Sequence, residues 1–155
     1  MRTIVVKIVF ALVLSVVFAG MTGCEGGQPR VSVENARAEM SPDMYREGII
    51  YLKIVNLGGK DKLVGLKTTI PGATASLHEM KGDFMVIAPS ITIPAKNTVD
   101  LMPMGSHIMV ENMPKNVQAG YSFVLMLVFD RTGEVRLPLT FAKPQPTMRE
   151  HEHRE

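Results

Sequence analysis

The sequence contains only one cysteine, no tryptophan and few aromatic side chains, and each scarcity excludes a class of function. A single cysteine cannot form an internal disulfide, a CxxC redox motif or a thiolate metal cluster. The 17 Lys and Arg residues nearly balance the 15 Asp and Glu residues, so the formal charge is only +2. A charge so close to zero does not indicate a surface that binds nucleic acid. We therefore expect no nucleic acid among the partners.

The motifs of the common enzyme classes are also missing. We find no nucleophile motif, no HExxH pair, no phosphate-binding glycine loop and no evident pair of carboxylates. A zinc hydrolase built on two histidines would need a third nitrogen or oxygen ligand. The chain is instead rich in methionine, with 12 residues, and thioethers are poor zinc ligands. We expect a protein that is not an enzyme.

The first 24 residues indicate export and lipidation. A short basic start is followed by an uncharged, mostly apolar run at residues 8–19, which is too short to span a bilayer. Small residues then lead to Cys24, an arrangement that resembles the bacterial lipoprotein signal, in which the cysteine is diacylated. The alternatives are an uncleaved anchor or an ordinary signal peptide. We expect a signal peptide at residues 1–23 and an extracytoplasmic, periplasm-facing protein anchored in the membrane through Cys24.

The rest of the chain predicts one β domain at residues 31–142. Apolar and polar residues alternate there with a period of two, and turn residues recur about every ten positions. Short strands at this spacing favour an antiparallel sandwich or barrel. Residues 24–30 indicate a lipidated cysteine with a tether, residues 143–155 a flexible tail, and Ser41–Arg46 a short helical turn. The predicted strands are 31–38, 48–56, 62–69, 74–80, 84–88, 90–93, 98–102, 107–111, 122–130 and 134–141.

Two His-x-Met pairs are the strongest chemical feature. His78 and Met80 are two residues apart on one predicted strand, so their side chains point to the same face. His107 and Met109 repeat this spacing on another strand. Thioether sulfur is soft and prefers Cu(I), and imidazole adds affinity while it is neutral. A blue-copper site would need a cysteine thiolate, which the domain lacks. The pattern therefore predicts a Cu(I) site that weakens as the pH falls through the histidine range.

The spacing Met85-x21-His107-x-Met109, preceded by His78, resembles the pattern His-x10-Met-x21-His-x-Met of the PCuAC family of periplasmic copper chaperones. This resemblance implies a cupredoxin-like Greek-key β-barrel that binds Cu(I) near its surface through His78, Met85, His107 and Met109. It also implies a copper acceptor as partner. That acceptor would be the dinuclear copper centre of a cytochrome c oxidase subunit, another copper chaperone or another periplasmic copper protein. Further similar segments are residues 31–36, 51–56, 93–95 and 136–141.

One spacing differs from the family pattern. Only six residues separate His78 from Met85, four fewer than in the family. A hairpin shortened by an even number of residues keeps the same side-chain facing, so Met85 can still reach the site. Met80 is the alternative source of this thioether.

Other methionines and histidines are weaker candidates. Met102 and Met104 precede His107, and they either add sulfur to the site or fill the edge of the sandwich. The tail carries Met148, His151 and His153, which form either a solvated terminus or a weak second site, since His-x-His in a flexible segment can chelate Cu(II). We expect the remaining methionines of the domain to fill the core, namely Met40, Met44, Met113 and Met126.

Two functional hypotheses follow. The first is a lipid-anchored Cu(I) metallochaperone that holds one copper ion and passes it to an acceptor protein by ligand exchange. The second is a non-catalytic β-sandwich lipoprotein whose methionine-rich edge is an apolar contact surface for another protein. The separation of His78 and His107 distinguishes them, because a contact surface does not need these histidines to be close.

Overall fold

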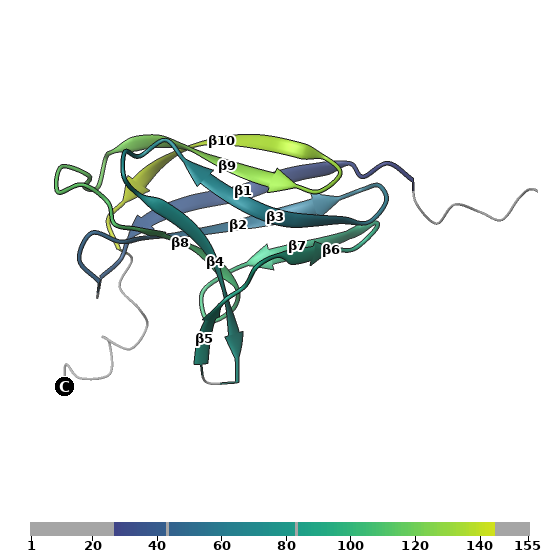
Figure 1. Ribbon diagram of the computed structural model, residues 1–155, viewed down its shortest axis with the longest axis horizontal. Helices are drawn as coiled ribbons and strands as arrows, with labels where there is room; N and C mark the ends of the chain where they lie inside the picture. Colours follow the sequence, from purple (N-terminus) through teal and green to yellow (C-terminus); the bar gives the residue numbers. More distant parts are fainter. Residues whose placement is uncertain (1–26, 43, 83, 145–155) are drawn as a thin grey trace, which may run out of the picture.

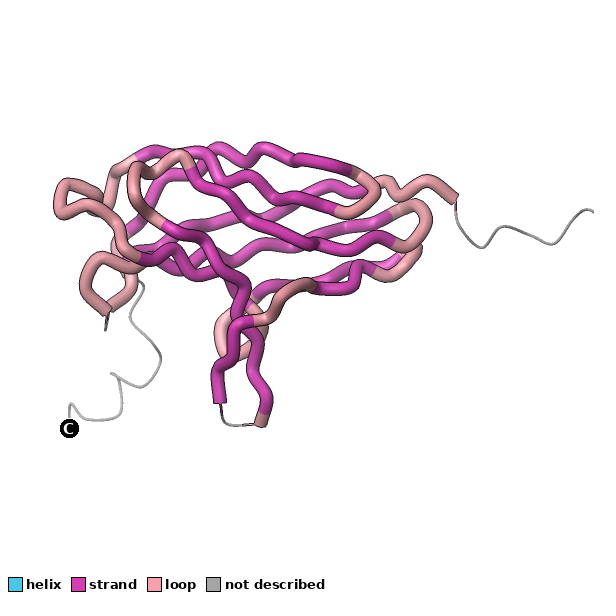
Figure 2. The backbone as a smooth tube through the Cα atoms, viewed as in Figure 1, coloured by secondary structure: helices cyan, strands magenta, loops and turns pink. Residues whose placement is uncertain are grey.

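A computed structural model describes residues 27–42, 44–82 and 84–144 (Figure 1). In this part of the chain the structure is all β, with ten strands and no helix (Figure 2). A helix able to cross a membrane is accordingly not found among these residues. The signal peptide predicted at 1–23, the anchor Cys24 and the tail candidates Met148, His151 and His153 lie outside the described residues.

All ten predicted strands are present, and each predicted end lies within two residues of the observed one. The helical turn expected at Ser41–Arg46 is wrong, because the described residues of this segment form bends and turns. Ser41 still accepts a hydrogen bond from the Met44 backbone N–H, as an N-cap would, although no helix follows. The strands are β1 (Val31–Met40), β2 (Gly48–Asn56), β3 (Asp61–Thr68), β4 (Thr74–Lys81), β5 (Phe84–Ile87), β6 (Ile91–Ile93), β7 (Asn97–Leu101), β8 (His107–Glu111), β9 (Ser122–Phe129) and β10 (Gly133–Ala142).

The strands form one curled sheet in the order β5-β4-β8-β2-β1-β10-β9-β3-β6, and β7 pairs with β2. The predicted antiparallel pairing holds for the described neighbours except β1 and β10, which are parallel, with Ala38 opposite Phe141. Parallel neighbours need a long connection, and the first and last strands have the whole domain between them. This pair closes the sheet around a single core into a half-barrel, which confirms the predicted cupredoxin-like β fold.

The core follows the alternation along the central strand β2. Ile50, Leu52 and Ile54 point inward and are buried, while the residues between them face out and are only half-buried. Phe141 of β10 packs so tightly over the end of this strand that a Cβ at Gly48 would lie 2.4 Å from its ring. Glycine at position 48 therefore allows β10 to close over β2.

Two buried polar residues join the turns at one end of the sheet. Asn56 accepts hydrogen bonds from two backbone N–H groups and donates to two backbone carbonyls. Asp61 accepts from the backbone N–H groups of Lys62, Arg131 and Thr132 and from the Thr132 hydroxyl. Burial opposes ionisation of Asp61, but these hydrogen bonds outweigh it and lower the pKa of the carboxyl group. Together Asn56 and Asp61 form what we call the polar corner.

The β4–β5 hairpin projects from the body of the domain (Figure 1). Strand β5 is an edge of the sheet, and its Phe84, Met85 and Ile87 side chains are exposed. The base of this hairpin is where β4 pairs with β8, so the projection begins beside the two predicted His-x-Met pairs.

Candidate metal centre

The structure brings the two histidines of the β domain together. Strands β4 and β8 are antiparallel neighbours, and His78 lies directly opposite His107. Their rings stack with centroids 5.8 Å apart and an interplanar angle of 28°. Leu77 and Ile108, each adjacent in sequence to one of the histidines, point into the core. The histidines therefore occupy the outer face of the sheet.

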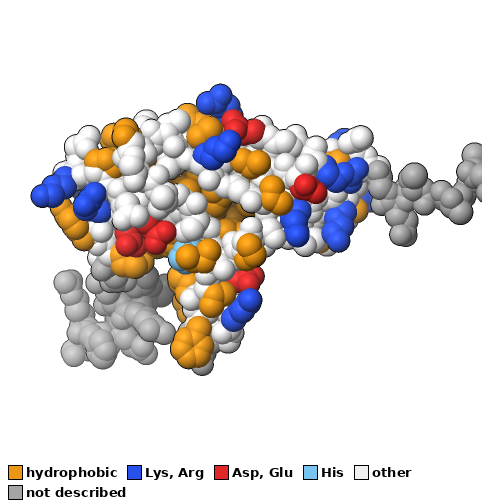
Figure 3. All heavy atoms as spheres, in the orientation of Figure 1, with side chains coloured by type: hydrophobic (Ala, Val, Ile, Leu, Met, Phe, Trp, Pro, Cys, Tyr) orange, Lys and Arg blue, Asp and Glu red, His pale blue; other side chains and the backbone are white. Residues whose placement is uncertain are grey.

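Apolar and aromatic side chains lie beside the histidine pair. His107 is only 6% exposed, and the Tyr51 ring lies with its centroid 6.3 Å away. Figure 3 shows histidine surface at the base of the projecting hairpin, with hydrophobic side chains beside it and along the hairpin and acidic side chains close by on the body of the domain. Burial in this setting shields the His107 ring from bulk water.

A single hydrogen bond sets the proton position on His107. Its Nδ1 lies 3.0 Å from the carbonyl oxygen of Gly105. A carbonyl can only accept, so Nδ1 carries the proton, and in the neutral ring Nε2 keeps its lone pair. His107 is therefore held with Nε2 as its available donor atom.

His78 has a buried nitrogen that is left unpaired. Its Nε2 lies 2.9 Å from the Ser76 hydroxyl, which is in turn 3.1 Å from the Glu111 carboxylate. Its Nδ1 is buried and has no hydrogen-bond partner among the described residues. A buried polar atom without a partner costs about 1–3 kcal/mol, so its presence needs an explanation such as a ligand.

The electrostatic environment also favours neutral His78. Burial, the largest effect, lowers the pKa of His78, and His107 lowers it as well. The carboxylates of Glu111 and Glu47 raise it, but the net result is a pKa below the ordinary value. Only the neutral ring can bind a metal ion, so this shift extends the pH range in which His78 can act as a ligand.

Met109 provides a thioether on the same face. It is two residues after His107 and only 2% exposed, with Ser76 and Ile49 as its cross-strand partners. Its neighbours on the strand, Ile108 and Val110, point into the core cluster, so Met109 is buried on the opposite face, which also carries the histidines.

The β4–β5 hairpin adds two more thioethers to this face. Met80 lies opposite Met85, and Met80 is two residues from His78, so both methionines share the facing of the histidine. Met80 is half-buried and Met85 is 50% exposed. No three His, Cys, Asp or Glu side chains form a potential metal site in the described chain. The thioethers are further uncharged donors on the face that carries the histidines.

The other methionines fall into two groups. Met102 and Met104 lie on the loop before His107 and are exposed, so filling the edge of the sandwich does not explain them. Met113 is fully buried and Met40 packs against the core, as predicted. The core prediction is wrong for Met44, an exposed turn residue, and for Met126, which occupies an outward position between Leu125 and Leu127 on β9.

Sequence reasoning missed three residues around the histidines: Ser76, Glu111 and Tyr51. The alternation of side-chain facing along a strand, with a period of two residues, could have identified Ser76 and Glu111. Ser76 precedes His78 by two residues, and Glu111 follows Met109 by two, so both share the facing of the site. Tyr51 depends on the pairing of β2 with β8, which the sequence pattern does not specify.

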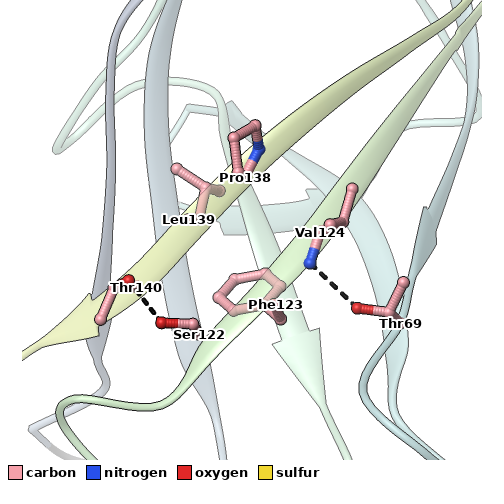
Figure 4. A pocket seen from close by; sticks show the side chains of 7 residues that line it. All are labelled: Thr69, Ser122, Phe123, Val124, Pro138, Leu139 and Thr140. Carbon is pink, nitrogen blue, oxygen red and sulfur yellow. Dashed lines mark hydrogen bonds between the residues drawn. The ribbon is translucent and has the colours of Figure 1, made fainter.

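A separate hollow lies over β9 and β10 (Figure 4). Its walls are held by a hydrogen bond between the Ser122 and Thr140 hydroxyls and by one from the Val124 backbone N–H to Thr69. Its described lining contains no histidine, methionine or charged side chain: Thr69, Ser122, Phe123, Val124, Pro138, Leu139 and Thr140. The hollow is therefore distinct from the histidine–methionine face.

Residues 31–141 match the profile of the family described as "Putative lipoprotein LpqE-like". The match covers most of the chain and all but the last residue of the ten strands, and the chain belongs to this family. No curated protein sequence matches the chain significantly.

Solved structures of PCuAC domains have the same fold. The apo PCuAC domain from PmoF1 is 26% identical, with a TM-score of 0.62 over 74% of this chain and 94% of that one. The copper-bound PCuAC domain from PmoF2 is 22% identical, with a TM-score of 0.61 over 74% and 93%. The Cu(I) form of DR1885 from Deinococcus radiodurans is 21% identical, with a TM-score of 0.56 over 80% and 83%. The predicted resemblance to PCuAC domains is thus confirmed.

Proposed function

We propose that this protein is an extracytoplasmic Cu(I)-binding metallochaperone. The observation that carries the proposal is the stacked pair His78 and His107 on the outer face of the sheet, with one buried nitrogen unpaired within the described structure. Two similar structures, the PCuAC domain from PmoF2 and DR1885, contain copper, which supports the proposal. Membership of a family described as lipoproteins supports a membrane anchor at Cys24.

The proposed ligands are two imidazoles and two thioethers. Nδ1 of His78, Nε2 of His107 and the sulfur of Met109 form the buried part of the set. The fourth donor is Met85, whose spacing to His107 follows the PCuAC pattern, with Met80 as the alternative on the same face. All four donors are uncharged and two are soft, which suits Cu(I) better than Zn²⁺ or Cu²⁺.

The difference in exposure between the thioethers suits transfer by ligand exchange. Met109 is 2% exposed, whereas Met85 is 50% exposed at the side of the hairpin. A donor atom of the acceptor protein would bond to copper as the bond to Met85 breaks, and the metal would remain Cu(I) throughout. The acceptor that the family resemblance suggests is the dinuclear centre of cytochrome c oxidase or another extracytoplasmic copper protein.

Further copper ligands belong to the same proposal. Met102 and Met104 are exposed on the loop before His107, where they could receive or hand over Cu(I). The tail residues Met148, His151 and His153 would form a second, weaker site for Cu(II). Neither role involves turnover, and the protein would not be an enzyme.

The alternative function is an apolar contact surface without metal. Exposed Phe84 and Ile87 on the hairpin favour contact with a partner protein. Such contact does not require the two histidines to stack, nor a buried nitrogen without a partner in the described chain. The apolar hairpin is equally compatible with a copper acceptor that approaches the site there.

The test is a Cu(I) titration of residues 25–144, which contain all the described strands and the described core, against a chromophoric chelator under reducing conditions. We expect saturation at one copper per chain, abolished in a His78→Ala/His107→Ala variant that keeps its circular dichroism spectrum. Met44→Leu, at an exposed methionine on a separate turn, is the matched control and should bind normally. Unchanged binding by the double variant would contradict the proposal, and adding residues 145–155 measures the contribution of the tail.

A further inference from the structure

The outer face of the sheet carries a hydrogen-bonded chain that ends on His78. Ser76 and His78 are two residues apart on β4, and Glu111 lies on the neighbouring strand β8, two residues after Met109. The distances are 3.1 Å from the Ser76 hydroxyl to Glu111 Oε2 and 2.9 Å from the same hydroxyl to His78 Nε2. A carboxylate, a hydroxyl and an imidazole are thus connected in a row.

The direction of each hydrogen bond follows from counting protons. The Glu111 carboxylate can only accept, so the single hydroxyl proton of Ser76 is donated to it. The Ser76 oxygen then has lone pairs left, and its contact with His78 requires a proton on Nε2. In a neutral imidazole the other nitrogen, Nδ1, keeps its lone pair, and this is the buried atom that has no partner in the described structure.

We infer that Ser76 and Glu111 are positioning residues that hold His78 in its Nε2–H tautomer, so that Nδ1 is the nitrogen presented to Cu(I). The choice of metal rests on the proposed function, whereas the tautomer rests on the hydrogen bonds alone. His107 is held in the opposite tautomer by the Gly105 carbonyl and presents Nε2. The two stacked rings therefore present different nitrogens as donor atoms.

The hydrogen-bonded row of Glu111, Ser76 and His78 should also make His78 a better ligand. A carboxylate that acts through a hydroxyl on the far nitrogen orients the ring and raises its basicity, and loss of such a partner typically weakens metal binding about 10–100-fold. We expect Ser76→Ala to weaken Cu(I) binding by about tenfold, the low end of this range. Ser76→Thr keeps the hydroxyl on a β-branched side chain that suits a strand, and it should restore the affinity.

The tautomer can be measured without copper, on residues 25–144, in which His78 and His107 are the only histidines. Long-range ¹H–¹⁵N correlation spectra of the metal-free protein, above the titration range of histidine, show which ring nitrogen carries the proton. We expect Nε2–H on His78 and Nδ1–H on His107. Ser76→Ala should turn His78 into a mixture of tautomers while His107 stays unchanged, and Ser76→Thr should restore the wild-type pattern.

The matched control is Glu79→Gln. This carboxylate is also on β4, next to His78, but it faces the other side of the sheet and pairs with Lys81. The control should change neither the tautomer of His78 nor the Cu(I) affinity, because the Glu79 carboxylate is not part of the hydrogen-bonded row of Glu111, Ser76 and His78.

Each outcome bears on a different part of the inference. A proton on Nδ1 of His78 in the wild type, or a tautomer unchanged by Ser76→Ala, would overturn the assignment of the hydrogen bonds. The expected tautomers combined with unchanged Cu(I) affinity in Ser76→Ala would overturn the positioning role. The expected tautomers in a wild type that binds no copper would overturn the proposed function and leave the tautomer assignment standing.

Discussion

The polar corner is buried, and the histidine pair is buried at His107 and half-buried at His78, but the hydrogen bonding of the polar atoms differs between the two regions. Asn56 and Asp61 are 0% and 3% exposed, and His107 is 6% exposed. At the corner each side-chain nitrogen and oxygen of Asn56 and Asp61 has a hydrogen-bond partner. At the histidine pair, Nδ1 of His78 has none within the described chain. A polar group that only stabilises the fold is satisfied by the fold, whereas one left open is available to a ligand.

The first prediction concerns the polar corner, where we expect the largest effect on the free energy of unfolding. Asp61→Ala removes the acceptor of three backbone N–H groups and one hydroxyl, all of them in part-buried hydrogen bonds. We expect a loss of about 3 kcal/mol or more in the free energy of unfolding. Urea titration measures this loss. A variant as stable as the wild type would show that the corner does not hold the turns together.

The second prediction concerns the histidine pair, where a substitution should change the Cu(I) affinity more than the free energy of unfolding. His107→Ala removes one proposed ligand and should lower the Cu(I) affinity by about tenfold or more. His78→Ala should do the same while the free energy of unfolding changes little, since the variant also removes the unpaired buried nitrogen. Competition with a chelator and urea titration give the two quantities. Equal losses of stability at His78 and at Asp61 would erase the contrast between the two regions.

The third prediction compares the two hairpin thioethers, whose side chains lie opposite each other. Met85→Leu should weaken Cu(I) binding by several-fold, up to about tenfold, because leucine keeps the apolar surface but offers no donor atom. Met80→Leu should weaken it less. Chelator competition on the two variants, measured side by side, provides the test. The reverse order would exchange the roles of Met80 and Met85.

The smallest expected effect is in the pH dependence of the polar corner. The folded pKa of Asp61 is below its ordinary value of 3.8, so its ionised form stabilises the fold above that pH. As the pH falls from 3.8 through the lower folded pKa, the carboxylate takes up a proton and this stabilisation is lost. The difference in unfolding free energy between wild type and Asp61→Ala should therefore shrink in this range. A difference that stays constant down to the lowest pH at which the protein folds would contradict the shift.

The strands and the candidate ligands could be predicted from the sequence because both depend on local patterns. Alternation with a period of two places His107 and Met109 on one face whatever the neighbouring strand is. The pairing of His78 with His107 depends on which strands become neighbours, and this is decided by the packing of the whole sheet. The same limit explains why the parallel pair β1–β10 and the roles of Ser76 and Glu111 were not predicted.

The register that places His78 opposite His107 also has a mechanical consequence. A metal ion bound by side chains of two adjacent strands would act as a cross-link between β4 and β8, at the point where the hairpin leaves the sheet. A ligand that binds only the folded state stabilises the elements it connects. Metal binding would thus stiffen the hairpin at its base and slow amide hydrogen exchange along β4 and β8. Loss of the metal would reverse both effects. The rigidity of the hairpin would then differ between the metal-bound and the metal-free protein.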